Sequence, residues 1–179
     1  MNNRVKELLK CKRMDFGESV RGNLLHGLYD LIREHITKES IVVEVGSYTG
    51  VSSELFALFC KQLYCIDNWQ GFAEKAEKIF DELIPKYNNI VKIKSTSHNA
   101  AKTFQDYSVD LVYIDAKHTY EAVKDDILSW VPKIKHNGII SGHDYNWSGV
   151  KKAVDEIFYN KHIKIYKDES WLIKFNNDL

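Results

Sequence analysis

The sequence predicts an α/β fold in which a mostly parallel sheet carries helices on both of its faces. Short runs rich in β-branched residues alternate along the chain with longer segments of helical period. These runs end in glycine or aspartate, as residues 41–45 do at Gly46. The length fits one domain over 1–179, with an N-terminal helical segment over 1–37 and an α/β core over 38–179.

The predicted elements follow one another with short connections. Apolar runs predict strands over 41–45, 63–66, 90–93, 109–114 and 139–141, and a closing hairpin of 162–166 and 171–175. Helical periods predict helices over 19–36, 51–61, 72–87, 98–105, 120–134 and 149–159. Residues 1–14 are either a short basic helix or a tail, and residues 135–138 are interpreted as a helix stop. Ligands of such sheets bind beyond the carboxyl ends of the strands, so the residues just after each strand are the candidates for function.

Charge and cysteine content argue against several classes of protein. Twenty-five basic and twenty-five acidic residues cancel, so the total charge does not indicate a nucleic-acid partner. The cysteines at 11, 60 and 65 show no paired spacing, which argues against a secreted disulfide framework. No apolar run reaches the roughly 18 residues of a membrane span, and no signal peptide is apparent. We therefore expect a cytoplasmic protein without a membrane partner, and a homodimer stays open.

The first candidate site follows the first predicted strand, in the segment Glu44-Val-Gly-Ser-Tyr-Thr-Gly50. Gly46 lets the chain turn sharply with no side chain in the way of a ligand. Gly50 lets the next helix begin close to the sheet, where its free N–H groups can bind a carboxylate. A tight turn without a ligand is an equally weighted alternative. Tyr48 stands where a dinucleotide fingerprint has its middle glycine, which argues against a bound pyrophosphate.

Further candidates follow the second and third predicted strands. Asp67 lies about twenty residues beyond Gly46, and a carboxylate there can bind both hydroxyls of a ribose. The alternative is a helix N-cap, but the spacing favours the ribose. Trp69 either covers the face of an adenine or lies in the core. Ser97 and its neighbours can bond the edge of an adenine or cap the next helix, and their composition favours the cap.

Two acidic residues and two histidines follow the fourth and fifth predicted strands. Asp115 and His118 come after the fourth strand, and His143 and Asp144 come after the fifth. Adjacent parallel strands would bring these four side chains to one cleft. Such a set can bind a divalent metal ion, or it can take a proton from a substrate hydroxyl. The alternative is a pair of solvated loops without a function.

Together these residues resemble a known family. The segment at 44–50, Asp67, the strand end Tyr-Ile-Asp115-Ala-Lys-His-Thr-Tyr and the stretch Asn137-Gly-Ile-Ile-Ser-Gly-His-Asp-Tyr are similar to class I S-adenosylmethionine-dependent methyltransferases. The nearest subgroup is that of small bacterial enzymes linked to glycan or natural-product tailoring. The resemblance runs from about residue 38 to the C-terminus.

The resemblance implies a Rossmann-like, seven-stranded sheet with an antiparallel last strand, and S-adenosylmethionine as the cofactor. It implies that Glu44 helps to place the methionine amino group, that Asp67 binds the ribose and that Ser97 lies near the adenine. The cofactor-binding residues implied in this way are Glu44, Gly46, Ser47, Tyr48, Gly50, Asp67, Asn68, Ser97 and Asp115.

A looser resemblance to metal-dependent, catechol-type O-methyltransferases implies Mg²⁺ or Mn²⁺ on Asp115 and Asp144. Tyr145 stands where that group has asparagine, and His118 stands where it keeps a lysine base. We therefore expect O-methylation of a small-molecule or glycan hydroxyl, with Asp115 in the catalytic site, His118 as the base and His143 as the second candidate base. The alternatives are a non-catalytic cofactor-binding protein and a nicotinamide-dependent oxidoreductase.

Overall fold

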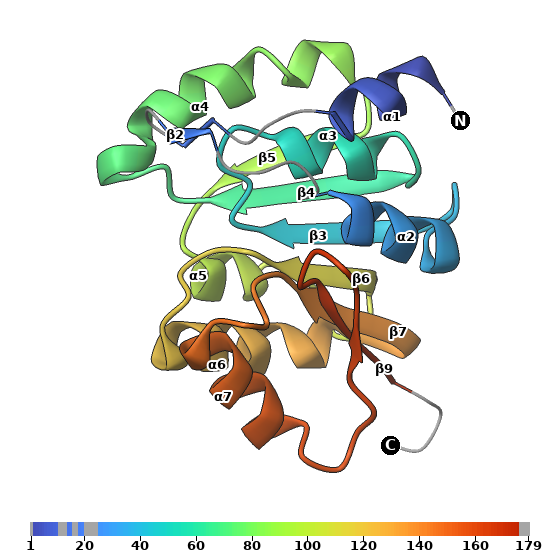
Figure 1. Cartoon of the computed structure of the whole chain (residues 1–179), viewed down its shortest axis with the longest axis vertical. Helices are drawn as coiled ribbons and strands as arrows, with labels where there is room; N and C mark the ends of the chain where they lie inside the picture. Colours follow the sequence, from blue (N-terminus) through green and yellow to red (C-terminus); the bar gives the residue numbers. More distant parts are fainter. Residues whose placement is uncertain (1, 11–13, 16–17, 20–24, 176–179) are drawn as a thin grey trace.

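The computed structural model describes residues 2–10, 14–15, 18–19 and 25–175. It holds a seven-stranded sheet in the order β5-β4-β3-β6-β7-β9-β8 (Figure 1). The pairs from β5 to β7 are parallel, and β9 runs antiparallel to both β7 and β8. This confirms the predicted, mostly parallel sheet with an antiparallel last strand. The strands are β3 (Ile41–Val45), β4 (Gln62–Asp67), β5 (Ile90–Lys94), β6 (Val109–Ile114), β7 (Ile134–Gly142), β8 (Lys164–Ile165) and β9 (Trp171–Lys174).

The central strands are buried on both faces, which explains their sequences. In β3 and β6 every residue is buried except Ile41 and Asp110, which are half-buried. A strand between two layers of helices has no solvent face, so its sequence is a nearly continuous apolar run rather than an alternation. Glu44, the fourth residue of β3, is the fully buried carboxylic acid in these two strands.

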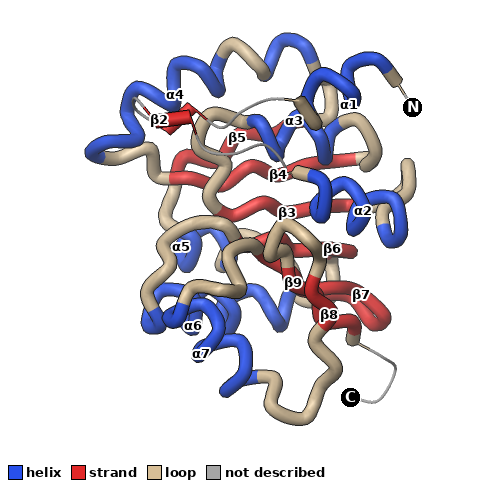
Figure 2. The backbone as a smooth tube through the Cα atoms, in the orientation of Figure 1, coloured by secondary structure: helices blue, strands red, loops and turns tan. Residues whose placement is uncertain are grey.

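Helices cover the two faces of the sheet in separate layers (Figures 1 and 2). The first layer has a core around Phe56 and Phe80, and the second has a core around Trp130 and Trp171. Within the described ranges no helix is long and apolar enough to cross a membrane. The first layer holds α1 (Asn3–Leu8), α2 (His26–His35), α3 (Val51–Ala57) and α4 (Glu74–Asp81), and the second holds α5 (Ser97–Ala101), α6 (Tyr120–Trp130) and α7 (Ser148–Ile157).

The predicted helix over 19–36 is wrong at its start. Strand β2 (Glu18–Ser19) pairs with β1 (Met14–Asp15) in a two-stranded antiparallel ribbon. The helix begins at His26, and residues 20–24 lie outside the described part of the chain. Most apolar residues that define the helical period follow this start, so the pattern located the helix but not its first residue.

Strand β7 is longer than the strand predicted over 139–141. Residues 135–138 continue it instead of ending a helix. Asn137 has a left-handed φ of 62°, and the pairing with β6 shifts register in this region. A Cβ on Gly138 would collide with the neighbouring backbone. The Asn-Gly pair therefore lies at an irregularity of the strand. Such residues are common at strand irregularities as well as after helices, which is why the helix stop was predicted here.

The other predicted helices are present, and most are shorter than predicted. The segment 72–87 contains α4 up to Asp81 and then a separate 3₁₀ turn over Ile84–Lys86. Pro85 in this turn has no N–H for the helical ladder, and its ring clashes with the preceding turn. Pro132 lies in a similar 3₁₀ turn directly after α6. Proline therefore explains where both helices end.

The N-terminal helix α1 is tied to the core by a charged contact. Arg4 donates from Nε and Nη2 to the two carboxylate oxygens of Glu54 on α3, at 2.8 and 2.6 Å. The hydroxyl of Tyr87 donates to the same carboxylate at 2.6 Å. Burial opposes the charge of Glu54, but the hydrogen bonds from Arg4 and Tyr87 outweigh it and lower the pKa. Helix α1 also buries Val5 and Leu8.

Arg4→Ala should lower the free energy of unfolding at neutral pH by roughly 1 to 3 kcal/mol, the scale of a lost charge-assisted hydrogen bond. The pKa of Glu54 is lower in the folded than in the unfolded chain, so its contribution is present above about pH 4.3 and is lost as the pH falls. Denaturant unfolding at about pH 7 and about pH 3 should show the difference between wild type and variant shrinking with acid. An unchanged difference would mean that Arg4 acts by packing alone.

Candidate active site

The carboxyl ends of β3, β4, β6 and β7 meet at one edge of the sheet (Figure 1). Three of the following loops contain a non-glycine residue in the left-handed region, with φ of 47° at Tyr48, 46° at Trp69 and 56° at Asp144. Such conformations cost roughly 1 to 3 kcal/mol each and persist only where the surroundings hold them. Strain of this kind gathers at binding sites, which makes this edge the place to look for one.

Gly46 ends β3 directly against β6. Its φ is +92°, its N–H donates to the Ile66 carbonyl at 2.8 Å, and a Cβ would lie 2.1 Å from the Asp115 carbonyl oxygen. The neighbouring backbone therefore already requires glycine at position 46, whether or not a ligand is bound. Gly50 precedes α3 with φ of +86°, and a Cβ there would lie 2.7 Å from Leu83 Cδ2.

The side chain of Glu44 lies inside the molecule and not on the open edge. It is 0 % exposed, and Ser53 donates a hydrogen bond to its Oε2. Burial raises the pKa of Glu44, although the hydroxyls of Ser52, Ser53 and Ser47 act in the opposite direction. The carboxyl group thus links β3 to α3, the helix that follows the loop after β3.

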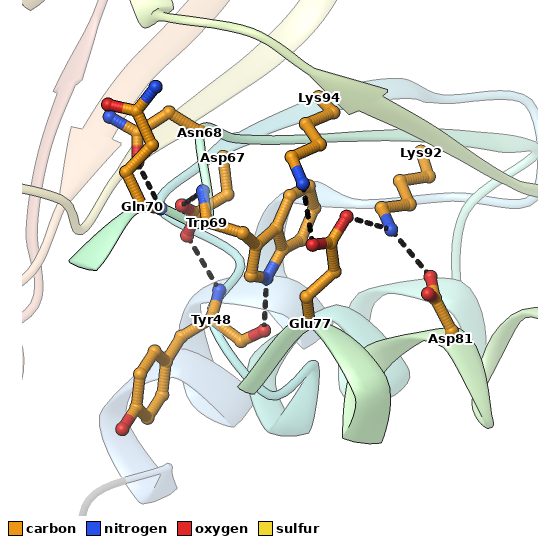
Figure 3. A network of polar contacts seen from close by, with 9 residues as sticks. All are labelled: Tyr48, Asp67, Asn68, Trp69, Gln70, Glu77, Asp81, Lys92 and Lys94. Atoms are coloured by element: carbon orange, nitrogen blue, oxygen red, sulfur yellow. Dashed lines mark hydrogen bonds and ion pairs between the residues drawn. The ribbon is translucent and has the colours of Figure 1, made fainter. Parts of the chain in front are cut away.

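Asp67 at the end of β4 links the loops after β3 and β4 (Figure 3). Its oxygens accept the backbone N–H of Tyr48 at 3.0 Å and that of Trp69 at 2.8 Å. The Trp69 indole donates in turn to the Tyr48 carbonyl at 2.8 Å. These bonds hold both left-handed residues. Each carboxylate oxygen has a further lone pair, so Asp67 is held in one orientation and can still accept ligand hydroxyls.

The residues after Asp67 differ in exposure. Trp69 is 1 % exposed, packs on Phe80 with ring centroids 5.0 Å apart, and has the Lys92 ammonium 4.7 Å from its ring centre. It is therefore a core residue and not a cover for an adenine. Asn68 is exposed, and its Oδ1 accepts the N–H of Gln70 at 3.0 Å (Figure 3).

Ser97 is the first residue of α5, and its hydroxyl bonds a side chain of the second helix layer. Its hydroxyl accepts the indole N–H of Trp130 on α6 at 2.9 Å. The neighbouring Thr96 caps α5, where its side chain accepts the N–H of Asn99. The cap preferred for this segment is thus present, and the N–H of Ser95 donates to the Asp67 carbonyl at 3.0 Å, so the segment begins beside the end of β4.

Asp115 after β6 and Asp144 after β7 both approach the same nitrogen of His118. The Nε2 of His118 is 2.9 Å from Asp144 Oδ2 and 3.5 Å from Asp115 Oδ1. Hydrogen bonds with Asp115 and Asp144 raise the pKa of His118 to about 9. Burial opposes the charge of Asp144, but His118 and His143 outweigh it and hold its pKa well below the usual range. Without another cation, the imidazolium neutralises part of this acidic pair.

Ligand atoms of Asp115, His118 and Asp144 lie within 4.8 Å of one another. Two carboxylates and an imidazole suit Mg²⁺ or Mn²⁺, and the imidazole also admits softer ions. A divalent ion would supply the positive charge that the proton on His118 supplies otherwise. The donor set therefore fits a metal ion. Tyr145 is not part of it, since its hydroxyl donates to Asp155 at 2.5 Å.

His143 lies beside this cluster in a more enclosed place. It is 6 % exposed, and its Nδ1 is 3.2 Å from Asp144 Oδ1. Burial opposes its charge, but Asp144 and Asp115 outweigh burial and raise the pKa. Among the described residues neither Nδ1 nor Nε2 has a hydrogen-bond partner, which is costly unless a ligand provides one. His143 lines a chamber together with Leu25, Leu28, Gly46, Ser47, Tyr48, Thr49, Val51, Ser52, Tyr113 and Asp115.

Residues 43–145 match the model of a family described as "Methyltransferase domain", and this match covers more than half of the chain. The chain belongs to this methyltransferase-domain family. The match begins in β3 and ends after Asp144, so it contains the strand ends that form the chamber and the acidic cluster.

Solved structures share the fold of this methyltransferase domain. A Streptococcus mutans protein in complex with SAH is 13 % identical, has a TM-score of 0.67 and covers 87 % of this chain and 98 % of its own. For an rRNA methylase from Streptococcus thermophilus the identity is 16 %, the TM-score 0.66 and the coverage 87 % and 97 %. For the O-methyltransferase NovP the values are 15 %, 0.65, and 87 % and 78 %. At such identities the likeness shows the fold alone, and the named acceptors differ.

A curated relative, the uncharacterized protein y4gI of Sinorhizobium fredii, is 26 % identical over an alignment of 137 residues, and the match covers 68 % of this chain. The chain spans only 15 % of the length of that relative. The relative therefore contains much more than the matched region, and it does not indicate an acceptor.

Sequence patterns missed two features of the methyltransferase domain. Leu25 and Leu28 line the chamber, although their helical period marked them only as core residues. Trp147 is 55 % exposed and lies against His118, with ring centroids 5.0 Å apart. A large aromatic side chain three residues after Asp144 is a signal that could have found it.

Gly46→Ala should lower the free energy of unfolding by at least about 3 kcal/mol, because backbone strain at positive φ adds to a collision with the Asp115 carbonyl. Gly71→Ala is the matched control, since Gly71 also has a positive φ of +63° but has open space around its Cβ position. It should cost only about 1 to 2 kcal/mol. Denaturant unfolding measures both, and equal losses would contradict the close approach of β3 and β6.

Proposed function

We propose that the methyltransferase domain transfers a methyl group from S-adenosylmethionine to a hydroxyl of a small molecule or glycan. The observation that carries this proposal is the chamber at the ends of β3, β6 and β7, where the loop at Gly46 meets Asp115 and His143. The cofactor supplies an electrophilic methyl group, which passes to the acceptor oxygen as the carbon–sulfur bond breaks. A hydroxyl acceptor also has to lose a proton, and the side chains around this chamber can accept it.

The residues at the ends of β3 and β4 are our candidates for holding the cofactor. Asp67 is oriented by two backbone N–H groups and keeps lone pairs for the ribose hydroxyls. Gly46, Ser47 and Tyr48 line the chamber and would face the methionine part. Ser97 is the exception, since its hydroxyl is engaged by Trp130.

We assign different tasks to the two histidines. The Nε2 of His118 is shared by two carboxylates, so His118 belongs with Asp115 and Asp144 as a ligand of a divalent ion. Such an ion would lower the pKa of an acceptor hydroxyl. His143 lines the chamber, and neither of its ring nitrogens has a hydrogen-bond partner among the described residues, so it is our first candidate to take the proton. This reverses the order of the two candidates that position along the chain favoured.

Asp67→Asn should weaken binding of S-adenosylhomocysteine by roughly 1.5 to 3 kcal/mol, about 10- to 150-fold, because a charge-assisted hydrogen bond is lost. Asparagine keeps one acceptor oxygen for the loops, which alanine would not. Asp110→Asn is the control, because Asp110 accepts the Ile41 N–H at 2.8 Å at the opposite edge of the sheet. Calorimetry should show a loss for Asp67→Asn alone, and equal affinities would remove Asp67 from the cofactor site.

Mn²⁺ should bind to the wild-type chain and at least about 10-fold more weakly to Asp144→Asn, because removing one charged ligand weakens a site of hard donors. Electron paramagnetic resonance of free Mn²⁺ during titration measures this without an acceptor. Asp155→Asn, which alters a carboxylate outside the cluster, is the control. Methyl transfer that survives exhaustive chelation would show that Asp115 and Asp144 only position a polar acceptor.

His143→Gln should lower methyl transfer by about 10²-fold or more, the usual scale of general-base catalysis, and leave the affinity for S-adenosylhomocysteine unchanged. The assay follows labelled methyl groups from S-adenosylmethionine to phenols and glycosides, with amines and RNA as comparison acceptors. Normal transfer by His143→Gln would refute its role as base. Transfer only to amines or RNA would refute the hydroxyl acceptor, and cofactor binding without any transfer would favour a non-catalytic protein.

A further inference from the structure

Helix α2 begins without a cap of its own. Its N-cap residue, Leu25, makes no side-chain hydrogen bond to the first turn. Instead the N–H of Leu28 donates at 2.7 Å to Oδ2 of Asp168, a residue 140 positions further along the chain. Leu28 is the third residue of the helix, whose N–H an N-cap side chain normally satisfies. The turn between β8 and β9 thus supplies the cap of a helix from the other end of the chain.

The carboxylate of Asp168 is held in one position by its surroundings. Its side chain is buried, and Oδ1 accepts the N–H of Ser170 at 3.1 Å. A Cβ on Gly27 would lie 1.8 Å from this same Oδ1. Glycine in a helix costs up to about 1 kcal/mol relative to alanine, so Gly27 is explained by the room that the carboxylate needs.

The same turn also contacts two other parts of the active site. The Glu169 carbonyl accepts the N–H of Tyr145, in the loop after β7, at 3.1 Å. The Ser170 hydroxyl lies 3.0 Å from the hydroxyl of Tyr113, which lines the chamber. The turn therefore contacts α2, β6 and the loop after β7 together.

The other polar contacts between this hairpin and α2 lie beyond the first turn of the helix, where the buried Tyr166 donates its hydroxyl to Glu34 at 2.8 Å. Lys164 and Lys167 pair with Glu34 and Asp30 on the outer side of the helix. Exposed ion pairs contribute roughly 0 to 1 kcal/mol. A buried carboxylate that accepts two backbone N–H bonds has no water to replace them, so its loss leaves donors unsatisfied. The contact through Asp168 is therefore the one on which the start of α2 depends.

We propose that Asp168 is a positioning residue of the methyl-transfer chamber: by capping α2 it holds Leu25 and Leu28 as the apolar wall that faces the loop at Gly46. This inference rests on the proposed function, since it takes the chamber to enclose the methionine end of the cofactor. An apolar wall there excludes water from the methyl group and contacts the sulfur substituents. When the cap is lost, the first turn of α2 frays and the wall loses its position.

The test uses S-adenosylhomocysteine as the probe and the full chain. Asp168→Ala should weaken binding at least about 10-fold by calorimetry. In the wild type the probe should slow amide hydrogen exchange in α2, and in Asp168→Ala this protection should be absent. Asp110→Ala is the matched control, because it removes an acceptor of the Ile41 N–H far from the chamber. It should lower stability comparably and leave both readouts unchanged.

Two further variants keep the test decisive. Gly27→Ala leaves Asp168 in the chain but displaces its carboxylate, so it should also weaken binding of the probe. If Asp168→Ala does not fold, Asp168→Asn replaces it, because asparagine keeps the side-chain volume and one acceptor oxygen. This variant should weaken binding of the probe at least about 3-fold. Wild-type affinity in folded Asp168 variants would overturn the proposal and leave Asp168 with stability alone. A wild-type chain that does not bind the probe would refute the proposed function itself.

Discussion

The backbones of β3 and β6 meet at Gly46 with no room for a side chain, and the rest of the active site depends on this contact. The Gly46 N–H donates to Ile66 of β4, and the Asp115 N–H donates to Val45 of β3. Three neighbouring strands therefore end in one hydrogen-bonded set. Asp67 and Asp115 arrive at the same edge because the sheet register places them there, and a rigid sheet positions side chains more narrowly than a loop does.

The three carboxylates at this edge differ in what compensates their charge. Asp67 accepts backbone N–H groups, which are fixed dipoles, so it needs no cation and is suited to neutral hydroxyls. Asp115 and Asp144 lie close together, and the proton of His118, or a metal ion in its place, neutralises part of their charge. The edge is thus divided into a part suited to neutral hydroxyl groups and a part suited to a cation.

The positions of the strands could be predicted, whereas several connections between distant segments could not. Burial on both faces leaves continuous apolar runs, and each run ends at a residue that the edge requires, such as Gly46 or Asp67. Asn137 and Gly138 suit a helix stop and a strand irregularity equally, so the start of β7 was misplaced. The cap of α2 comes from Asp168, 140 residues away, and no local pattern around α2 contains it.

The two histidines show the same limit at the level of chemistry. Both follow a strand end, and position along the chain favoured His118 without showing what either ring contacts. Asp144 does distinguish them, because it approaches Nε2 of His118 at 2.9 Å and Nδ1 of His143 at 3.2 Å. The first contact engages Nε2 of His118, whereas neither ring nitrogen of His143 makes a hydrogen bond among the described residues. Asp144 therefore completes the acidic cluster and acts on His143 through its charge, so a change of charge in the cluster is felt at His143.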